Sequence, residues 1–345
     1  MTRVLYVSAT SGVHDRRMIT AWAEGGVEVT SLVLDGSSRS SDLVAEAVSQ
    51  FSPDVVQAGP VPDIAFAVAQ SWQGPLIATS WGFDLLADID ADDAARERAA
   101  STLTRAEVVM VDSDAVRDRA RALGASEEAV VQFPWGIDHE LFRQEGADMR
   151  EALGLDNGVT CILSVRRHES LYDVATLVRA FALAAPVSHD TVLLIGGEGR
   201  LTPMLRELVD EAGLADRVRF LAELRGEQLA ALYRTADVYV STSTVDGSSI
   251  SLLEAMASGA VPLVTDIAGN RQWVPSDVGL RFPVGDHEAL ARALVELAAD
   301  ASRRRRLAHT AQQLVRERAD WNDGPKKLRG AADLAITRHD AKGAS

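Results

Sequence analysis

Residues 238–265 read VYVSTSTVDGSSISLLEAMASGAVPLVT. Two short runs of β-branched and apolar residues, Val238–Ser241 and Val261–Thr265, are typical of buried strands. Between them, small and glycine residues lead into a helix that we expect at about 249–258. A strand, a helix and a second strand in this order predict a β-α-β unit with parallel strands.

The same alternation runs through most of the 345 residues. The strands expected in the first half are Val4–Ser8, Val27–Leu34, Asp54–Gln57, Leu76–Thr79, Val108–Val111 and Val130–Phe133. The further strands expected in the second half are Val159–Val165, Val192–Ile195 and Val218–Leu221. Helical stretches lie between these runs, and the sequence beyond residue 287 is helical, with a break expected at 323–325. We therefore predict an α/β protein built on parallel sheets.

Helical periodicity lapses between Phe133 and Phe142, where glycine and proline occur, and we place the domain boundary around 138–155. This gives two doubly wound Rossmann-like domains, 1–140 and 155–320. Residues 321–345 are expected to form a helical segment that crosses back to the first domain. Doubly wound sheets bind ligands beyond the carboxyl ends of their strands, so two facing sheets suit a two-substrate reaction.

Composition excludes several classes of function. The net charge is −15, which argues against nucleic acid as a partner because phosphate binding requires clustered Lys and Arg. Residues 1–150 hold 12 Lys and Arg against 24 Asp and Glu, a balance of −12. The sequence lacks an apolar run of about 18 residues, so we expect no membrane insertion. The single cysteine, Cys161, lies in an apolar run and is expected to be buried, and we expect a cytoplasmic protein.

The loop and helix start at 246–250 suit a diphosphate. Backbone N–H groups at a helix N-terminus, together with the helix dipole, favour anions, so Gly247, Ser248, Ser249 and Ile250 are candidate donor-binding residues. Glu254 follows Asp246 by eight positions. A carboxylate on that helix can accept hydrogen bonds from two adjacent ribose hydroxyls, and Asp246 from hydroxyls of a transferred sugar. The alternative is an ordinary helix cap with solvated carboxylates.

This segment resembles the Glu-x7-Glu motif of glycosyltransferase family 4, including its Leu-Glu-Ala-Met-Ala-x-Gly-x-Pro continuation at Leu253–Pro262. Asp246 stands where the first Glu usually is. The resemblance implies a GT-B fold, a nucleotide-sugar donor whose ribose is held by Glu254, and a donor sugar contacted by Asp246. It covers most of the chain and is strongest from 160 to 320.

Two further strand ends resemble donor-binding segments of the family. In Ile195-Gly-Gly-Glu-Gly-Arg200, Gly197 is a candidate for donor binding, or only part of a tight strand-to-helix turn. In Ser164-Val-Arg-Arg-His-Glu169, Arg166 fits the family's phosphate-binding Arg and Arg167 lies beside it. The Lys that the family places five residues later is Leu171 here. Arg167, His168 or Arg271 are candidate substitutes, although His168 is also expected as a structural or solvent-facing residue.

In the first half, Thr79-Ser-Trp-Gly-Phe-Asp-Leu85 resembles the family's His-Gly-x-Asp strand end. Trp81 replaces the His and cannot act as an acid or base. Asp84 is retained, and it either orients an acceptor hydroxyl, as a catalytic residue, or caps a helix. In the opening turn Ser8–Arg17, Gly12 permits close approach of a ligand to the backbone, and Asp15 and Arg16 are candidate acceptor contacts, with helix capping as the alternative for Asp15.

We therefore expect a metal-independent, retaining glycosyltransferase with Arg166, Asp246 and Asp84 as its candidate catalytic residues. It would transfer a sugar from a nucleoside-diphosphate donor to an acceptor hydroxyl, with no separate cofactor and no metal site. The charge of the first half favours a neutral or cationic small-molecule or glycan acceptor. Two alternatives remain: a catalytically silent nucleotide-sugar-binding subunit, motivated by Leu171 and Trp81, and a nucleotide-sugar epimerase of the same architecture.

Overall fold

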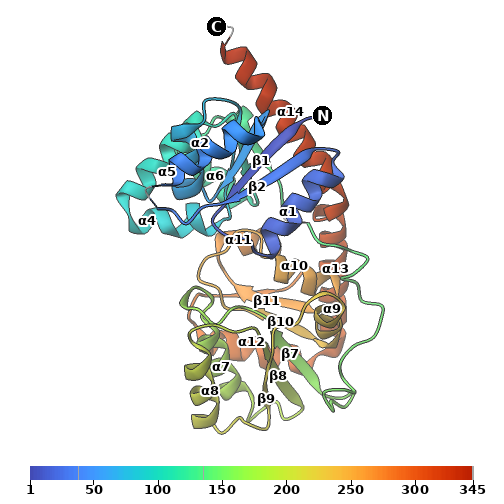
Figure 1. Ribbon diagram of the computed structural model, residues 1–345. Helices are drawn as coiled ribbons and strands as arrows, with labels where there is room; N and C mark the ends of the chain where they lie inside the picture. The colour runs from blue at the N-terminus through green and yellow to red at the C-terminus, as the bar shows by residue number, and fades with distance from the viewer. Residues whose placement is uncertain (38, 135, 344–345) are drawn as a thin grey trace. The chain divides into compact units, whose positions relative to one another are not determined.

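The computed structural model describes residues 1–37, 39–134 and 136–343. The chain divides into two compact units. Unit 1 comprises residues up to Pro134 together with the C-terminal residues from Asn322, and unit 2 comprises the residues between them. Each unit contains a six-stranded sheet flanked by helices (Figure 1). The α/β class predicted from the alternating pattern is confirmed.

Unit 1 begins with a strand and ends with the last helix of the chain. Its strands are β1 (Arg3–Ser8), β2 (Glu28–Val33), β3 (Val55–Gly59), β4 (Leu76–Thr79), β5 (Val108–Val111) and β6 (Val130–Gln132). Its helices are α1 (Val13–Glu24), α2 (Ser40–Phe51), α3 (Phe66–Ser71), α4 (Ile89–Ala91), α5 (Asp93–Arg105), α6 (Asp114–Ala122) and α14 (Gly324–Gly343). Two π-helical turns, Val61–Ala65 and Asp84–Asp88, follow β3 and β4.

Unit 2 repeats the alternation. Its strands are β7 (Thr160–Ser164), β8 (Thr191–Gly196), β9 (Val218–Leu221), β10 (Val238–Ser241), β11 (Val261–Thr265) and β12 (Leu280–Phe282). Its helices are α7 (Val174–Ala184), α8 (Thr202–Glu211), α9 (Gly226–Thr235), α10 (Ile250–Ala257), α11 (Ala268–Arg271), α12 (His287–Ala299) and α13 (Ala301–Arg318). Separate apolar clusters fill the two faces of this sheet, one under α7 and α12 and the other under α9, α10 and α13.

The strand order places a switch point in each sheet. The first sheet has the order β2-β1-β3-β4-β5-β6 and the second β12-β11-β10-β7-β8-β9, and the strand pairs are parallel. The direction of winding therefore reverses between β1 and β3 in unit 1 and between β7 and β10 in unit 2. The central strands are buried throughout whereas the edge strand β2 is largely exposed, as expected for parallel sheets covered on both faces.

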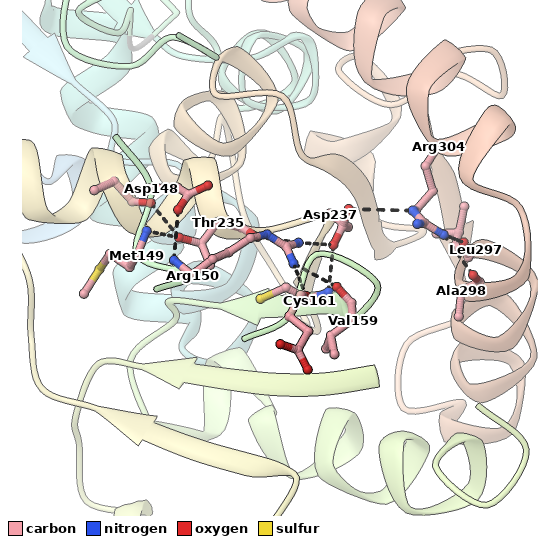
Figure 2. A network of polar contacts seen from close by, with 12 residues as sticks. Asp148, Met149, Arg150, Val159, Cys161, Thr235, Asp237, Leu297, Ala298 and Arg304 are labelled. Atoms are coloured by element: carbon pink, nitrogen blue, oxygen red, sulfur yellow. Dashed lines mark hydrogen bonds and ion pairs between the residues drawn. The ribbon is translucent and has the colours of Figure 1, made fainter. Parts of the chain in front are cut away.

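The segment before β7 is tied to the amino-terminal edge of the second sheet (Figure 2). Arg150 donates to the Asp237 carboxylate at 2.7 Å and to the Thr235 carbonyl at 3.2 Å. Asp237 also accepts from the backbone N–H of Cys161 at 2.8 Å, and Arg304 of α13 lies 3.9 Å from its carboxylate. The stretch 138–155, where we expected the boundary, thus lies within unit 2. Cys161 is buried as predicted, and burial raises the pKa of its thiol to about 12.

The C-terminal helix α14 belongs to unit 1. Leu328, Ala332 and Ala335 of this helix are fully buried, and Arg329 donates to the Gly25 carbonyl at the end of α1 at 3.3 Å. Near the end of the helix, Lys342 donates to the buried Glu107 at 3.1 Å. These contacts join the last helix to the first 134 residues of the chain.

Candidate functional site

The donor-binding candidates of unit 2 lie at its switch point. Arg166 follows β7, and Asp246 lies in the loop between β10 and α10. The direction of winding reverses between these two strands, β7 and β10. The backbone of this loop is held from the β7 side, because the carbonyls of Leu171 and Tyr172 accept hydrogen bonds from Thr244 and Thr242. The position where the family carries Lys, now Leu171, therefore contributes a backbone contact to the loop.

Helix α11 packs against the backbone of the same loop. A Cβ atom added to Gly269 would lie 2.1 Å from the Asp246 carbonyl oxygen and 2.3 Å from that of Gly247. Ser248 is buried, and its hydroxyl accepts hydrogen bonds from Gln272 at 3.0 Å and from Trp273 at 2.9 Å. Ser248 thus fixes the path of the backbone. Neither Gly269 nor the two side chains on Ser248 were predicted as site residues.

Arg166 is the centre of a compact polar cluster. Its Nη1 donates to Ser249 at 2.5 Å and to Ser251 at 2.9 Å, and its Nη2 donates to Asp246 at 2.6 Å. Tyr172 lies against the guanidinium, with Cζ 4.3 Å from the ring centroid, a cation–π contact. Arg166 is 9% exposed, and its Nε has no hydrogen-bond partner within the described part of the chain. The structure therefore brings Arg166, Asp246 and Ser249 together and leaves N–H capacity on the guanidinium.

The charge of this cluster is balanced. Burial alone would lower the pKa of Arg166, but the Asp246 carboxylate together with Tyr239 and Tyr172 outweighs it, so that the pKa of the guanidinium lies above its usual value. Asp246 keeps 19% of its side chain exposed. An arginine held by two hydroxyls, a carboxylate and an aromatic face needs little reorganisation when an anionic ligand arrives. Ser249 also lies at the N-cap of α10, where the first N–H groups have no partner within the helix.

Glu254 is partly exposed on α10 and has a buried neighbour. Tyr233 of α9 is fully buried, and its hydroxyl donates to the Glu254 carboxylate at 3.0 Å. Burial, and then the nearby carboxylate, raise the pKa of Tyr233 well above its usual value, so the phenol remains a donor. The rings of Phe142 and Tyr239 pack against Tyr233 at centroid distances of 5.9 and 6.3 Å. Tyr233 was not predicted as a site residue, and it holds one edge of the Glu254 carboxylate.

The glycine turn after β8 packs on the Arg166 loop. Gly197 has a φ of 99°, and a Cβ added there would lie 2.9 Å from the Arg166 carbonyl oxygen. At Gly199 the corresponding distance to the His168 carbonyl oxygen is 2.4 Å. Side chains at these positions would push the 166–168 segment away. Gly197 therefore allows close packing beside Arg166. This matches the alternative given for it, a tight strand-to-helix turn.

The other cationic candidates differ from Arg166. The side chain of Arg167 is exposed and forms no hydrogen bond or ion pair with any residue in 1–37, 39–134 or 136–343. Arg271 is paired with Asp266 at 3.0 Å, with 59% of its side chain exposed. His168 is buried and contacts Thr202 at 2.8 Å, and burial, followed by the charge of Arg206, lowers its pKa. Of the three substitutes considered for the missing Lys, only Arg167 has its charge available without breaking an ion pair.

In unit 1, Asp84 is fully buried and acts on the backbone of two loops. Its carboxylate accepts hydrogen bonds from Val61 N at 2.9 Å, Trp81 N at 3.0 Å and the Ser80 hydroxyl at 2.6 Å. With these partners and no exposed surface, Asp84 holds together the segments that follow β3 and β4. This arrangement corrects the expectation that it orients an acceptor hydroxyl by direct contact. Trp81 beside it is partly exposed, and its ring centroid lies 6.3 Å from that of His14.

The opening turn is organised around Asp15. This buried carboxylate accepts hydrogen bonds from Tyr6 at 2.9 Å, Thr10 at 2.6 Å and Gly12 N at 2.8 Å. Asp15 therefore caps α1, the alternative considered for it. Gly12 has extended backbone angles and a negative φ, and a Cβ there would meet only ordinary contacts at 3.4 Å. Arg16 is exposed and donates to the Ser11 carbonyl. Gly12, Asp15, Arg16 and Asp84 lie in unit 1, whereas the candidates from Arg166 onwards lie in unit 2.

The buried Asp84 gives a pH-dependent prediction. Burial raises its pKa from 3.8 to about 6, so its contribution to stability is fully present below pH 3.8 and is lost as the pH rises through 6. An Asp84→Asn variant lacks one hydrogen-bond acceptor, and this loss lowers its unfolding free energy by the same amount at every pH. The unfolding free energy of the variant should therefore rise relative to wild type by about 2.5 kcal/mol between pH 4 and 7, at about 1.4 kcal/mol per pKa unit, because the unfolded Asp84 is already partly ionised at pH 4. Denaturation at the two pH values measures this, and an unchanged difference would show that Asp84 is ionised at both.

Two features of the described residues concern metals and membranes. Within residues 1–37, 39–134 and 136–343, His, Cys, Asp and Glu side chains form no group of three or more that is placed to hold a metal ion. Among the helices that the structure describes, none combines the length and apolar character needed to cross a membrane.

The family match lies within unit 2. Residues 146–314 match the family model described as glycosyl transferases group 1. A D-inositol 3-phosphate glycosyltransferase from Salinispora tropica is 35% identical over 200 residues, which are 55% of this chain and 41% of that protein. The chain spans about half the length of the first curated relatives it matches, 52%, 41% and 55%.

Two solved structures share the fold over the whole chain. Sucrose-phosphate synthase from Thermosynechococcus elongatus has a TM-score of 0.80 at 19% identity, and covers 100% of both chains. The Anabaena protein HepE in complex with UDP-glucose has a TM-score of 0.79 at 18% identity, again over 100% of both chains. The fold is thus GT-B, as predicted. The fold and the family match together support a glycosyltransferase. The family model that matches is the one for group 1.

Proposed function

We propose that this protein is a retaining, metal-independent glycosyltransferase of family 4 that transfers a sugar from a nucleoside-diphosphate donor to an acceptor hydroxyl. The observation that carries the proposal is the cluster of Arg166, Asp246 and Ser249 at the start of α10, with Glu254 further along the same helix. HepE, a protein of the same fold, is described in complex with UDP-glucose, which supports a nucleotide-sugar donor.

Different residues of the site bind different parts of the donor. The diphosphate binds at the N-terminus of α10, where the dipole and N–H groups favour anions, and receives the remaining N–H groups of Arg166. Glu254 accepts two ribose hydroxyls while Tyr233 holds the carboxylate. Asp246, ion-paired to Arg166 at 2.6 Å, accepts hydroxyls of the donor sugar. Each of these groups is positioned before the ligand arrives.

Transfer then needs positioning and charge stabilisation. The bond between the sugar's anomeric carbon and the phosphate oxygen breaks, and the acceptor oxygen attacks from the same face. The acceptor proton passes to the departing phosphate oxygen, which gives a glycoside with retained configuration and a free nucleoside diphosphate. Arg166 and the α10 N-terminus stabilise the charge that develops on this leaving group.

A thermal-shift panel of nucleoside-diphosphate sugars tests this function. A donor at 100 times its Kd should stabilise the protein by about 2.7 kcal/mol, well within detection. Release of nucleoside diphosphate in the presence of an acceptor then establishes transfer. Failure of every nucleotide sugar to shift the unfolding temperature would contradict the proposal.

A second candidate function is nucleotide-sugar binding without transfer. Leu171 in place of the family's Lys favours it, since Arg166 is then the single buried cation of the described cluster. Loss of one comparable donor costs about 10²–10³ in rate elsewhere. Donor transfer or hydrolysis by the purified protein at more than background rate would dismiss this candidate.

The acceptor follows from charge. The curated relative from Salinispora tropica takes, by its name, a phosphorylated acceptor. The first 150 residues of this chain carry 12 basic and 24 acidic residues, so we propose a neutral or cationic small-molecule or glycan acceptor. The matched family model covers only residues 146–314 and is silent on this point.

Tyr233 gives a prediction specific to the ribose. In a Tyr233→Phe variant the fold should persist, because the ring keeps its packing against Phe142 and Tyr239. The Glu254 carboxylate loses one fixed donor, so the Kd for a nucleoside diphosphate should rise about 5- to 10-fold. Calorimetric titration measures this. The 2′,3′-dideoxy analogue is the internal control: its Kd should be the same for both proteins, and an equal loss for both ligands would mean that Tyr233 acts only on the fold.

A further inference from the structure

A cavity of about 650 Å³ lies within unit 1. Residues that follow three neighbouring strands line it: Ala9 after β1, Leu34 after β2 and Pro60 after β3. The cavity thus lies at the switch point between β1 and β3, beyond the carboxyl ends of the strands, where doubly wound sheets bind ligands. Its volume falls in the range of about 300–1,000 Å³ typical of small-molecule sites.

The lining combines apolar and hydrogen-bonding groups. Its apolar lining residues are Leu34, Ile64 and Phe66, of which Phe66 is partly exposed. Ser40 contributes a hydroxyl group, Gln70 an amide group and Asp35 a carboxylate. A sugar presents C–H faces together with many hydroxyls, so a lining of this mixed kind matches its chemistry, and a purely apolar cavity would leave those hydroxyls unpaired.

The charge of the cavity is slightly negative. Two carboxylates, Asp35 and Asp63, line it against one guanidinium, Arg98. Arg98 is already shared, since its Nη2 lies 3.1 Å from Asp63 and 3.9 Å from Asp92. Its Nε donates to the Pro62 carbonyl at 2.9 Å. A phosphate entering this cavity would meet one more carboxylate than cation, whereas hydroxyl and ammonium groups would find acceptors.

Ser40 supplies a second observation at the same place. It is the first residue of α2, lines the cavity and is only 4% exposed. Its Oγ has no hydrogen-bond partner among the residues that the structure describes. A buried hydroxyl without a partner is unfavourable and calls for an explanation. Rotation about χ1 gives this hydroxyl three staggered positions, so a ligand hydroxyl in the cavity can supply the missing bond.

We propose that this cavity binds a neutral or cationic polyhydroxylated ligand of monosaccharide to disaccharide size. Asp35 and Asp63 accept hydrogens from its hydroxyl or ammonium groups, and Ser40 bonds a further hydroxyl. That this ligand is the acceptor rests on the proposed function, whereas its binding to unit 1 does not.

The full-length protein, titrated with matched sugars and followed by ligand-observed nuclear magnetic resonance, tests the proposal. The probes are glucosamine and glucosamine 6-phosphate, and N-acetylglucosamine and its 6-phosphate. In each pair the unphosphorylated sugar is expected to bind at least about tenfold more tightly, because of the extra carboxylate. Tighter binding of the phosphates would overturn the proposal, and so would absence of binding by all four sugars.

Two variants locate the binding. Ser40→Ala should weaken sugar binding about 5- to 10-fold without lowering the unfolding temperature, because it removes an unpaired hydroxyl. Ser49→Ala, on the exposed side of the same helix, is the matched control and should bind as wild type. Ala67→Leu should block the cavity that Ala67 lines. Sugar binding unchanged in Ala67→Leu would place the ligand elsewhere and overturn the proposal.

The same samples separate this inference from the proposed function. Nucleoside-diphosphate binding is measured alongside in each variant and should be unchanged, because Ser40 and Ala67 lie in unit 1. Sugar binding without any nucleotide binding would count against the glycosyltransferase and leave the cavity assigned. Nucleotide binding without sugar binding would do the reverse.

Discussion

The Glu254→Ala variant is expected to bind nucleoside diphosphates at least about 100-fold more weakly than the wild-type protein. A carboxylate that accepts two ribose hydroxyls forms two charge-assisted hydrogen bonds, each contributing about 1.5–3 kcal/mol. The contact of Glu254 with Tyr233 at 3.0 Å holds the carboxylate in place before the ligand binds. Calorimetric titration with the nucleoside diphosphate of the donor measures the loss.

Two further variants make this result specific. Glu254→Gln keeps the size of the side chain and one acceptor oxygen, so its affinity should lie between those of wild type and Glu254→Ala. Glu207→Ala removes an exposed glutamate of α8 in the same unit and should bind as wild type. Wild-type affinity in Glu254→Ala would remove the ribose assignment.

The Arg166→Lys variant should lose nearly as much activity as Arg166→Ala, about 10²–10³ in kcat. Lysine keeps the charge but is a point donor, and it cannot reach Ser249, Ser251 and Asp246 together as the planar guanidinium does. Initial rates of nucleoside-diphosphate release at saturating donor measure the effect. Arg179→Ala, an exposed arginine on α7, is the control for loss of a positive charge.

A structural role alone would give a different pattern. Arg166 is 9% exposed, so the unfolding temperature of each variant is measured together with its rate. Added guanidinium should partly restore the rate of Arg166→Ala, because the vacated site still holds Asp246 and two hydroxyls. A kcat for Arg166→Lys within a few-fold of wild type would mean that the leaving group is stabilised by other groups.

The strands were predictable because the sequence pattern that indicates a strand is local. Leu76–Thr79, Val108–Val111, Val218–Leu221, Val238–Ser241 and Val261–Thr265 have the predicted bounds. Strand β12 was not predicted, since Leu280-Arg-Phe282 is too short to show a pattern, and it is defined by pairing with β11.

The candidate site residues were predicted one short segment at a time, whereas the contacts between the segments were not. Asp246 and Glu254 belong to one recognisable segment, and their loop and helix lie where the pattern placed them. The ion pair between Arg166 and Asp246 joins residues 80 positions apart, and the strand order brings them together. Tyr233 and Gly269 carry no sequence signal of their role, because that role consists of one long-range contact each. Asp84 was a candidate catalytic group because burial cannot be read from a motif.

A crystal structure of the protein with its nucleoside diphosphate tests the central claim most directly. We predict that the diphosphate lies at the N-terminus of α10 beside Arg166, and that both ribose hydroxyls donate to Glu254 while Tyr233 remains bonded to the same carboxylate. A nucleotide bound elsewhere, or a ribose that does not contact Glu254, would contradict this account of the site.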